Sequence, residues 1–412
     1  MENYVIIGNG TAAVSCIEGI RSADAESPIT VISGEKYPAY CRPLISYALE
    51  GKADPEKMNQ RSADFYEKNG CTVLYGKKAA GIDPDQKTVT LDDGSCLPYT
   101  KLCVAAGSSP FVPSMTGLDT VEKKFSFMTM DDMLALDAAV TKDSRVLIVG
   151  AGLIGLKCAE GLAERVGALT VCDLAPRVLS SILDEECAAL IEAKLEERGI
   201  SFLLGDTADR FERDRAVMKS GKTVDFDILV LAVGVRANTA LIRDIGGEVN
   251  RGIVVDTHMR TSIPDVYAAG DCAEGFDSSL GTNRVLAILP NARFQGECAG
   301  INMAGGERTF ENAVPLNAIG FFGLHSLTAG SAPEGCGVYE ERGPGRIKKL
   351  YTKDGILTGF ALIGYEERAG IYTSLIRERI PLDTLDFELL KHSATTAAFP
   401  PAERLRKFGG AV

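Results

Sequence analysis

The stretch Arg145–Glu160, R-V-L-I-V-G-A-G-L-I-G-L-K-C-A-E, decides the fold class. Its apolar residues Val146–Val149 predict a short buried strand, and a glycine turn then leads into a helix. Gly150 suits the tight turn, Gly152 lets a pyrophosphate approach the backbone, and Gly155 allows close contact between helix and strand. Phosphates would bind at the helix N-terminus, where free N–H groups and the helix dipole favour negative charge.

The same pattern occurs near the start of the chain. Tyr4–Ile7 predicts a buried strand, and the turn Gly8-Asn9-Gly10-Thr11-Ala12-Ala13 leads into a helix. A single glycine-rich turn is a weak signal, so the repetition is what makes both turns informative. The next strand, Ile29–Ile32, is followed by Glu35, which is placed to bind a ribose hydroxyl. Ser33 is the alternative for that role.

The second unit also ends in an acidic residue. Strand Leu169–Cys172 is followed by Asp173, whose carboxylate would bind the adenosine ribose and repel a 2′-phosphate. This favours NADH over NADPH, although Arg177 offers a nearby cation for that phosphate. Each unit later has a strand that ends in a small or apolar residue and a glycine: Leu102–Ala105 before Ala106-Gly107, and Ile228–Ala232 before Val233-Gly234.

Composition indicates a globular protein of two or three domains, with 412 residues, 24% charged and 45% hydrophobic. The net charge of −12 argues against a nucleic-acid partner, and no apolar run has the length of a membrane span. The N-terminus has no basic n-region, so we expect no signal peptide and a cytoplasmic location. Eleven cysteines without C-x-x-C spacing predict buried free thiols and no metal site.

The later part of the chain adds two features. Strand Val266–Ala269 runs into Gly270-Asp271, and the segment Asn283–Gly300 includes a predicted helix that carries Asn291 and Gln295. From about residue 313, short strands with glycine turns predict a different domain. Its expected elements are a hairpin of Ile347–Tyr351 and Leu357–Ile363, a helix over Glu366–Arg379, and a basic tail with Arg404, Arg406 and Lys407. The tail is either a solvated helix face or a docking contact for an acidic partner.

Together these motifs resemble the FAD-dependent pyridine nucleotide–disulfide oxidoreductases, over nearly the whole chain. The most specific stretch is I-P-D-V-Y-A-A-G-D-C at Ile263–Cys272, where an aspartate of that family holds the flavin ribityl chain. The resemblance implies an α/β fold with two Rossmann-like dinucleotide-binding domains, for FAD and NAD(H), and a C-terminal α+β interface domain. The implied boundaries are 1–110 and 239–312 for the FAD domain, 111–238 for the NAD(H) domain and 313–412 for the interface domain.

The stretch Tyr40–Ser46, Y-C-R-P-L-I-S, is similar to the NADH:rubredoxin oxidoreductase and ferredoxin-reductase-like branch. Pro43 stands where the single-cysteine branch has its reactive cysteine, and Cys41 lies two positions away. Arg42 is a candidate partner for the cofactor diphosphate, or else an exposed arginine before a proline turn. Lys157 replaces the family's usual glutamate near the flavin–nicotinamide junction. It is our catalytic candidate, as a cation that stabilises negative charge on reduced flavin, or else an ordinary surface lysine.

The resemblance implies that cofactor contacts come from the glycine turns, the strand ends and the start of the late helix. The predicted cofactor-binding residues are Gly8, Asn9, Gly10, Thr11, Ala12, Ala13, Glu35, Arg42, Pro43, Ala79, Ala106, Gly107, Gly150, Gly152, Leu153, Ile154, Gly155, Asp173, Val233, Gly234, Gly270, Asp271, Asn291 and Gln295.

The implied reaction is hydride transfer between NADH and FAD, with electrons exchanged with a one-electron carrier: rubredoxin, ferredoxin or an iron–sulfur subunit. Flow in either direction uses the same site. One alternative is an NADH oxidase or disulfide/peroxide reductase that uses Cys41. Another is a flavin-bearing subunit of a larger redox metalloenzyme complex. The resemblance also leaves open whether the chain forms a homodimer.

Overall fold

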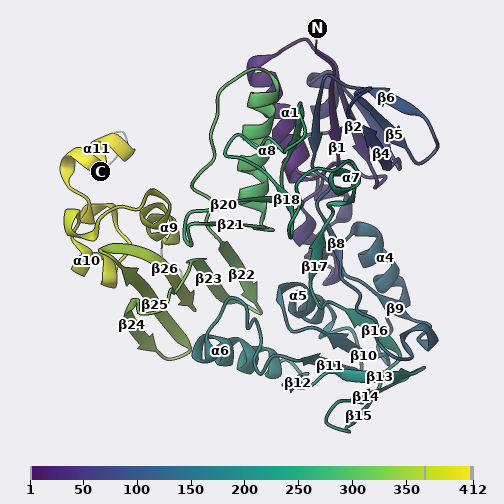
Figure 1. Cartoon of the computed structure of the whole chain (residues 1–412). Helices are drawn as coiled ribbons and strands as arrows, with labels where there is room; N and C mark the ends of the chain where they lie inside the picture. Colours follow the sequence, from purple (N-terminus) through teal and green to yellow (C-terminus); the bar gives the residue numbers. More distant parts are fainter. Residues whose placement is uncertain (1, 366–367, 409–412) are drawn as a thin grey trace.

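The computed structural model describes residues 2–365 and 368–408 (Figure 1). Its first sheet has five parallel strands in the order β19-β7-β1-β2-β3. These strands are β1 Tyr4–Ile7, β2 Ile29–Ser33, β3 Cys71–Tyr75, β7 Lys101–Val104 and β19 Val266–Ala268. The central strand β1 is buried along its whole length, because apolar side chains leave it on both faces and helices cover the sheet.

The second sheet repeats the first. It has five parallel strands in the order β12-β11-β10-β16-β9. They are β9 Lys124–Phe125, β10 Arg145–Val149, β11 Ala168–Asp173, β12 Ile200–Leu204 and β16 Ile228–Leu231. In both units a three-stranded antiparallel meander interrupts the series of parallel strands, between β3 and β7 in the first sheet and between β12 and β16 in the second. The meanders are β4 Ala79–Asp83, β5 Thr88–Leu91 and β6 Cys96–Pro98, and β13 Ala208–Glu212, β14 Arg215–Met218 and β15 Thr223–Asp225. The predicted pair of Rossmann-like domains is confirmed.

A two-stranded antiparallel ribbon joins the two sheets. Its strands are β8 Ser108–Pro110 and β17 Val235–Ala237, and they follow the strand-ending glycines Gly107 and Gly234. The ribbon lies next to the expected domain boundaries at residues 110 and 238, so the chain crosses between the two units here in both directions.

The C-terminal part has a single antiparallel sheet in the order β22-β23-β26-β25-β24. Its strands are β22 Leu316–Phe321, β23 Leu324–Gly330, β24 Gly337–Gly343, β25 Arg346–Lys353 and β26 Ile356–Ile363. The predicted hairpin corresponds to β25 and β26, which turn at Asp354-Gly355. The helices of this part are α9 Ala369–Glu378, which packs against β23 and β26, α10 Phe387–His392 and α11 Pro401–Phe408. Figure 1 shows this domain at the opposite end of the molecule from the first meander.

Helices α1 (Thr11–Ala23) and α8 (Leu289–Met303) pack closely against each other over the first sheet. A Cβ at Gly296 would overlap the carbonyl oxygen of Ala12, and one at Gly300 would overlap that of Cys16. The close approach therefore depends on glycine at both positions. It brings the start of the late helix beside the first glycine turn.

The helix predicted within Asn283–Gly300 is α8, which begins at Leu289. Residues Thr282–Arg284 form β21, which pairs with β20 (Ala273–Asp277), and Pro290 occupies the first turn of the helix. Proline suits this position because a first-turn N–H has no helical partner. For the expected helix over Glu366–Arg379, residues 366 and 367 lie outside the described part, and α9 covers Ala369–Glu378.

Residues 40–58 pack away from the first sheet, although they follow its second strand in the chain. Tyr40, Ile45, Leu49 and Met58 share one apolar core with the second parallel sheet and with Phe321 of the C-terminal sheet. This segment contains α2 (Ile45–Leu49), which lies against α4 (Met130–Ala139) and α5 (Leu153–Leu162). The remaining helices are α3 Phe65–Lys68, α6 Glu185–Glu196 and α7 Ala240–Arg243.

None of the helices in the described ranges is both long and apolar enough to cross a membrane.

Candidate functional site

The first glycine turn connects β1 to α1. Gly8 has φ +111°, and a Cβ there would overlap the carbonyl oxygen of Ala105, so glycine is required on both counts. Gly10 is the N-cap of α1 and has no side-chain cap. The space where a Cβ of Gly10 would lie is open, with no atom within 4 Å. The uncapped N–H groups of Thr11, Ala12 and Ala13 therefore face an open cradle.

The second turn repeats this geometry between β10 and α5. Gly150 has φ +117°, and its Cβ would overlap the carbonyl oxygen of Ala232. Gly152 is the uncapped N-cap of α5, again with no atom within 4 Å of a built Cβ. At Gly155 a Cβ would overlap the carbonyl oxygen of Gly150, so helix and turn are in direct contact. Leu153 and Ile154 form the half-buried first turn of α5.

Both turns have the features that a pyrophosphate requires. An open space at the second glycine allows phosphate oxygens to approach the backbone, and an uncapped helix start supplies N–H donors and a favourable dipole. We therefore find the residues present to fit two dinucleotides, one at each turn. The side chains around each turn distinguish the two sites.

Glu35 and Arg42 meet beside the first turn. Arg42 Nη2 lies 2.6 Å from Glu35 Oε1, and the Tyr40 hydroxyl donates to Glu35 Oε2 at 2.7 Å. Arg42 Nη1 also donates to the carbonyl oxygen of Met128 at 2.9 Å. The alternative acceptor for the ribose, Ser33, is buried and donates its hydroxyl to the carbonyl oxygen of Glu35 at 2.7 Å.

Two predicted residues lie near this pair. Pro43 follows Arg42 in a short 3₁₀ turn that leads into α2. Ala79 is the first residue of β4, and the chain just before it is attached to the end of β2, where the Lys77 N–H donates to the Ser33 carbonyl at 3.0 Å.

Asp271 follows β19, separated from it by Ala269 and Gly270, and its charge interacts with that of Arg42. The Ser108 hydroxyl donates to Asp271 Oδ2 at 3.2 Å. Burial raises the pKa of Asp271, while the Ser108 hydrogen bond and the charge of Arg42 act in the opposite direction. Arg42 is therefore ion-paired with Glu35 and also interacts with the charge of Asp271. An arginine head suits the diphosphate of FAD, and the two carboxylates suit its polyhydroxyl groups.

The start of α8 supports the same site. Gln295 is buried and its Oε1 accepts the Gly270 N–H at 2.8 Å, so it holds the turn that presents Asp271. Asn291 is also buried, and its Nδ2 donates to the Leu286 carbonyl at 3.2 Å. Its Oδ1 accepts no hydrogen bond from the described residues. A buried acceptor without a donor is costly, so it fits a donor supplied by a bound cofactor.

Asp173 closes the second turn. Its Oδ2 accepts the Ala151 N–H at 2.7 Å, and its Oδ1 accepts the Ala175 N–H at 2.8 Å. Arg177, the possible partner of a 2′-phosphate, is directed elsewhere: its guanidinium donates to the carbonyl oxygens of Leu183 at 3.0 Å and Ser180 at 3.4 Å. The turn therefore presents the Asp173 carboxylate, while the Arg177 guanidinium is held by backbone carbonyls.

The two strand ends meet through the connecting ribbon. Asn238, just after β17, donates from Nδ2 to the Ala106 carbonyl at 2.8 Å and from its backbone N–H to the Gly107 carbonyl at 3.0 Å. On the other side, the Phe111 N–H donates to the Gly234 carbonyl at 2.9 Å, next to the half-buried Val233. The ribbon thus holds the strand ends at Gly107 and Gly234 next to each other.

Sequence reasoning missed Asn238, and it also missed Gln60 and Tyr66. Gln60 Nε2 donates to Thr11 Oγ1 at 2.7 Å, and the Tyr66 hydroxyl donates to Asn9 Oδ1 at 2.7 Å. These partners lie 49 and 57 residues from the turn that they hold. No periodicity or motif marks them, because each contact depends on how distant segments pack.

Lys157 is mostly buried on α5, so it is not an ordinary surface lysine. Its ammonium forms an ion pair with Glu160, donates to the Gly320 carbonyl at 3.2 Å and lies 4.5 Å from the centre of the Tyr47 ring. Glu160 Oε1 in turn accepts the Phe322 N–H at 2.6 Å. The pair therefore fastens the turn between β22 and β23 to the second unit. Its catalytic role remains a prediction.

Cys41 does not have the surroundings of a reactive thiol. It is half-buried, and burial raises its pKa, which disfavours the thiolate. All eleven cysteines are free, and seven of them are buried, as expected from their spacing.

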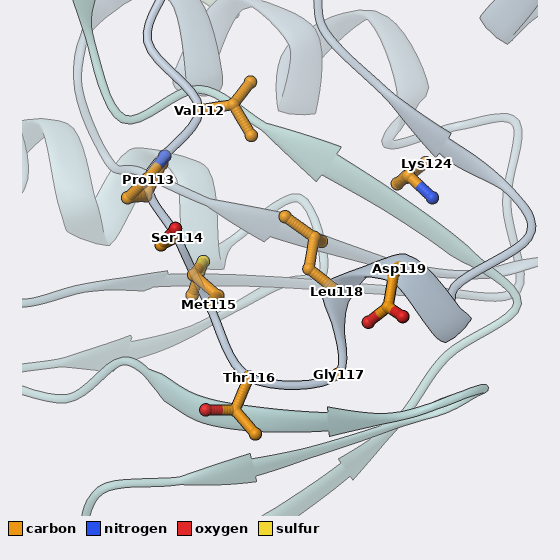
Figure 2. Close-up of a pocket in the computed structure, with 9 residues that line it drawn as sticks. All are labelled: Val112, Pro113, Ser114, Met115, Thr116, Gly117, Leu118, Asp119 and Lys124. Atoms are coloured by element: carbon orange, nitrogen blue, oxygen red, sulfur yellow. The ribbon is translucent and has the colours of Figure 1, made fainter.

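A hollow of about 810 Å³ lies along the loop Val112–Asp119 and Lys124, next to the start of the second unit. Figure 2 shows most of its side chains along the segment Val112–Asp119, with Lys124 on a separate strand, and the hollow includes none of the predicted site residues. We assign it no role in the chemistry.

Comparison with known proteins gives a consistent result. Residues 2–296 match the family model of the pyridine nucleotide-disulphide oxidoreductases. The epsilon subunit of the NADH-dependent phenylglyoxylate dehydrogenase of Aromatoleum evansii is 35% identical over 396 residues, which cover 93% of each chain. The assimilatory nitrate reductase electron transfer subunit of Bacillus subtilis (strain 168) is 32% identical over 92% of this chain and 50% of that protein.

Two solved structures show the same fold. The covalent putidaredoxin reductase–putidaredoxin complex matches with a TM-score of 0.86 at 24% identity, over 100% of this chain and 99% of that chain. The NADH:rubredoxin oxidoreductase from Clostridium acetobutylicum matches with a TM-score of 0.74 at 24% identity, over 93% and 96%.

Proposed function

This chain belongs to the pyridine nucleotide-disulphide oxidoreductase family, and we propose that it moves electrons between NADH and a one-electron protein carrier through FAD. Within that family it is an FAD-dependent oxidoreductase of nicotinamide nucleotides. The observation that carries the proposal is the pair of open, uncapped helix starts behind Gly10 and Gly152, on two equivalent sheets joined by one ribbon.

The chain's own residues bind and orient the two nucleotides. The turn of α1 and Arg42 would hold the FAD diphosphate, with Glu35 at the adenosine ribose and Asp271 at the ribityl chain. The turn of α5 would hold the NADH pyrophosphate, with Asp173 at the ribose. Bound FAD supplies the hydride-accepting and electron-releasing chemistry. Correct orientation of the two reactants is the main contribution of the protein.

We propose that electrons are exchanged with the carrier without a cysteine relay. The raised pKa of Cys41 keeps it protonated near neutral pH, and Pro43 occupies the position of a reactive cysteine. The NADH oxidase or disulfide/peroxide reductase alternative would need Cys41 as a thiolate.

NADH is the proposed nucleotide, in preference to NADPH. The Asp173 carboxylate would repel a 2′-phosphate, and the guanidinium of Arg177 is held by two backbone carbonyls. The direction of electron flow depends on the potentials of the partners, since both directions use one site.

A second candidate is the flavin-bearing subunit of a larger redox complex. The relative from Aromatoleum evansii, which matches over 93% of both chains, is itself named a subunit of a dehydrogenase.

The proposed compartment is the cytoplasm. Its support is that none of the eleven cysteines forms a disulfide, as is typical of proteins kept in a reducing environment.

A steady-state assay tests the proposal. The purified FAD-loaded chain is mixed with NADH and either the small dye dichlorophenolindophenol or rubredoxin, and oxidation of NADH is followed. We expect turnover with both acceptors. Failure to oxidise NADH with either acceptor, in a protein that retains FAD, would overturn the reductase proposal and favour the subunit role.

A further inference from the structure

Tyr40 connects the candidate FAD site to the first residue of a helix in the second unit. Its hydroxyl oxygen accepts the Met130 N–H at 2.9 Å, and its proton is donated to Glu35 Oε2 at 2.7 Å. Met130 begins α4, so its N–H has no partner inside the helix. A backbone N–H can only donate and an ionised carboxylate can only accept, which fixes the direction of both bonds. The hydrogen bonds therefore run from Met130 through Tyr40 to Glu35.

Arg42 makes a parallel connection to the other oxygen of the same carboxylate. Its Nη2 donates to Glu35 Oε1 at 2.6 Å, and its Nη1 donates to the Met128 carbonyl at 2.9 Å. Each oxygen of Glu35 thus accepts one bond from a side chain that is itself attached to the segment 128–130. Because a carboxylate has about four acceptor positions, about two remain for a ligand. An adenosine ribose offers hydroxyl groups at C2′ and C3′ to fill them.

The Tyr40 side chain is held in place by its packing. It is 7% exposed and belongs to the apolar core of the second parallel sheet. The Tyr37 ring meets it edge-on, with ring centres 6.3 Å apart, and the Arg42 head lies 5.3 Å from its centre. Burial raises the pKa of the Tyr40 hydroxyl, and the charge of Glu35 acts in the same direction. The hydroxyl therefore keeps its proton at neutral pH and remains a donor to Glu35.

Glu35 depends on these partners for the orientation of its carboxylate. It follows β2 outside any helix or strand, and its side chain is 27% exposed. Its main chain is fixed, since its carbonyl accepts the Ser33 hydroxyl at 2.7 Å and the Gly76 N–H at 3.3 Å. The side chain beyond the main chain still has several rotatable bonds, and ordering them on binding costs entropy. A carboxylate that is already oriented avoids that cost.

We propose that Tyr40 is a positioning residue for FAD, which directs the Glu35 carboxylate toward the hydroxyls of the adenosine ribose from the start of α4. The proposal rests on the proposed FAD-dependent function, and it adds that the second unit helps to build the site of the first nucleotide. The start of α4 also contributes the positive end of a helix dipole, which favours negative charge on Glu35. Retention of FAD therefore depends on a contact between the two units.

Release of the cofactor tests the proposal on the full chain. The chain is loaded with FAD or with an FAD analogue that carries 2′,3′-dideoxyadenosine, and release after dilution is followed by flavin fluorescence. The variants are Tyr40→Phe, Glu35→Ala and their combination. Tyr37→Phe is the matched control, because the Tyr37 hydroxyl makes the same kind of bond to the same helix start, donating to Asp131 Oδ1 at 2.6 Å.

We expect Tyr40→Phe to release FAD about tenfold faster than the wild type, because a hydrogen bond to a charged group is lost. Tyr40→Phe should release the analogue at the same rate as the wild type does, and Tyr37→Phe should match the wild type with both ligands. The combined variant should release FAD no faster than Glu35→Ala alone, since Tyr40 acts through Glu35. Equal acceleration of both ligands in Tyr40→Phe would show a purely structural role and overturn the proposal, and so would unchanged release of FAD.

A second measurement needs no substitution, so it applies even if Tyr40→Phe does not fold. Hydrogen exchange at the Met130 amide is compared in the wild type loaded with FAD and with the analogue. We expect about threefold slower exchange with FAD, because the ribose holds Glu35 and thereby strengthens the bonds through Tyr40. Equal exchange with the two ligands would overturn the proposal. A wild-type chain that takes up neither FAD nor the analogue would instead overturn the proposed function itself.

Discussion

Asp173 and Ala151 are joined by a hydrogen bond of 2.7 Å from the Ala151 N–H to Asp173 Oδ2. The bond ties the end of β11 to the middle of the second glycine turn. The carboxylate that would bind a nucleotide ribose therefore also holds the turn that would bind its pyrophosphate. Because each carboxylate oxygen accepts more than one hydrogen bond, the acid remains able to bind a ribose hydroxyl.

Replacement of Asp173 should lower nucleotide selectivity. In Asp173→Ala we expect kcat/KM for NADH to fall about 10- to 100-fold, since a charged acceptor contributes about 1.5–3 kcal/mol per bond. The value of kcat/KM for NADPH should fall less than that for NADH, because the substitution removes the repulsion between the carboxylate and the 2′-phosphate. The measurement is the ratio of kcat/KM for the two nucleotides. Arg177→Gln is the control, and a large effect of that variant on the ratio would contradict our account of Arg177.

Alanine at the open glycines should separate the two nucleotide sites. The space beside Gly152 is empty in the protein, so Gly152→Ala should change the free energy of unfolding by less than about 0.5 kcal/mol. Its methyl group would meet the pyrophosphate, and we expect KM for NADH to rise at least about tenfold with FAD content unchanged. Gly10→Ala should instead lower the FAD content of the purified protein, because its methyl group would meet the diphosphate of FAD. Loss of FAD from Gly152→Ala would show that the sites are assigned wrongly.

Removal of one member of the buried pair Lys157–Glu160 should be strongly destabilising. An uncompensated buried charge costs about 3–5 kcal/mol, and Glu160→Gln also weakens the bond from the Phe322 N–H. We expect lower stability against urea and faster hydrogen exchange at Phe322. Lys194→Met breaks the more exposed pair Lys194–Glu197 and should cost about 1 kcal/mol or less. Equal effects in the two variants would contradict a fastening role.

Asp271 should be unfavourable for the stability of the FAD-free protein at neutral pH. Burial raises its pKa above the ordinary value of 3.8, so the folded state binds the proton more tightly than the unfolded state. The free energy of unfolding therefore falls as the pH rises from about 3.8, the ordinary pKa, through the raised pKa of the folded state. We expect FAD-free Asp271→Asn to resist urea better than the wild type at pH 7, with the difference shrinking toward pH 4. A difference that does not vary with pH would contradict this cause.

Cys41→Ser should leave turnover with NADH and a one-electron acceptor unchanged, because a half-buried protonated thiol has no part in the proposed path. Peroxide and disulfide substrates are included in the measurement. Substantial turnover of either substrate by the wild type, lost in Cys41→Ser, would restore the cysteine-based alternative.

The parallel strands could be predicted because they are short apolar runs that end at glycines. Val146–Val149 lies within β10, and Tyr4–Ile7 is β1 without any shift. Glu35, just after β2, and Asp173, at the end of β11, follow from their spacing. Arg42 is suggested by the chemistry of its head group and Asp271 by the family resemblance. In the structure Arg42 pairs with Glu35 and interacts with the charge of Asp271.

Contacts between domains could not be predicted from local pattern. Glu160 is three residues from Lys157, but its bond to the Phe322 N–H spans 162 residues and depends on how the C-terminal sheet packs. Arg165 likewise donates to the carbonyl of Leu49, at the end of α2. Hydrophobic periodicity predicts which face of a helix or strand is buried, but it does not predict which other element packs against that face.

Anaerobic titration of the FAD-loaded protein, first with NADH and then in a separate sample with NADPH, tests the central claim most directly. The flavin absorbance is followed through each addition. We predict rapid bleaching by NADH at about one equivalent and much slower bleaching by NADPH. Absence of bleaching by both nucleotides, in a protein that retains FAD, would contradict the assignment of the second glycine turn to NADH.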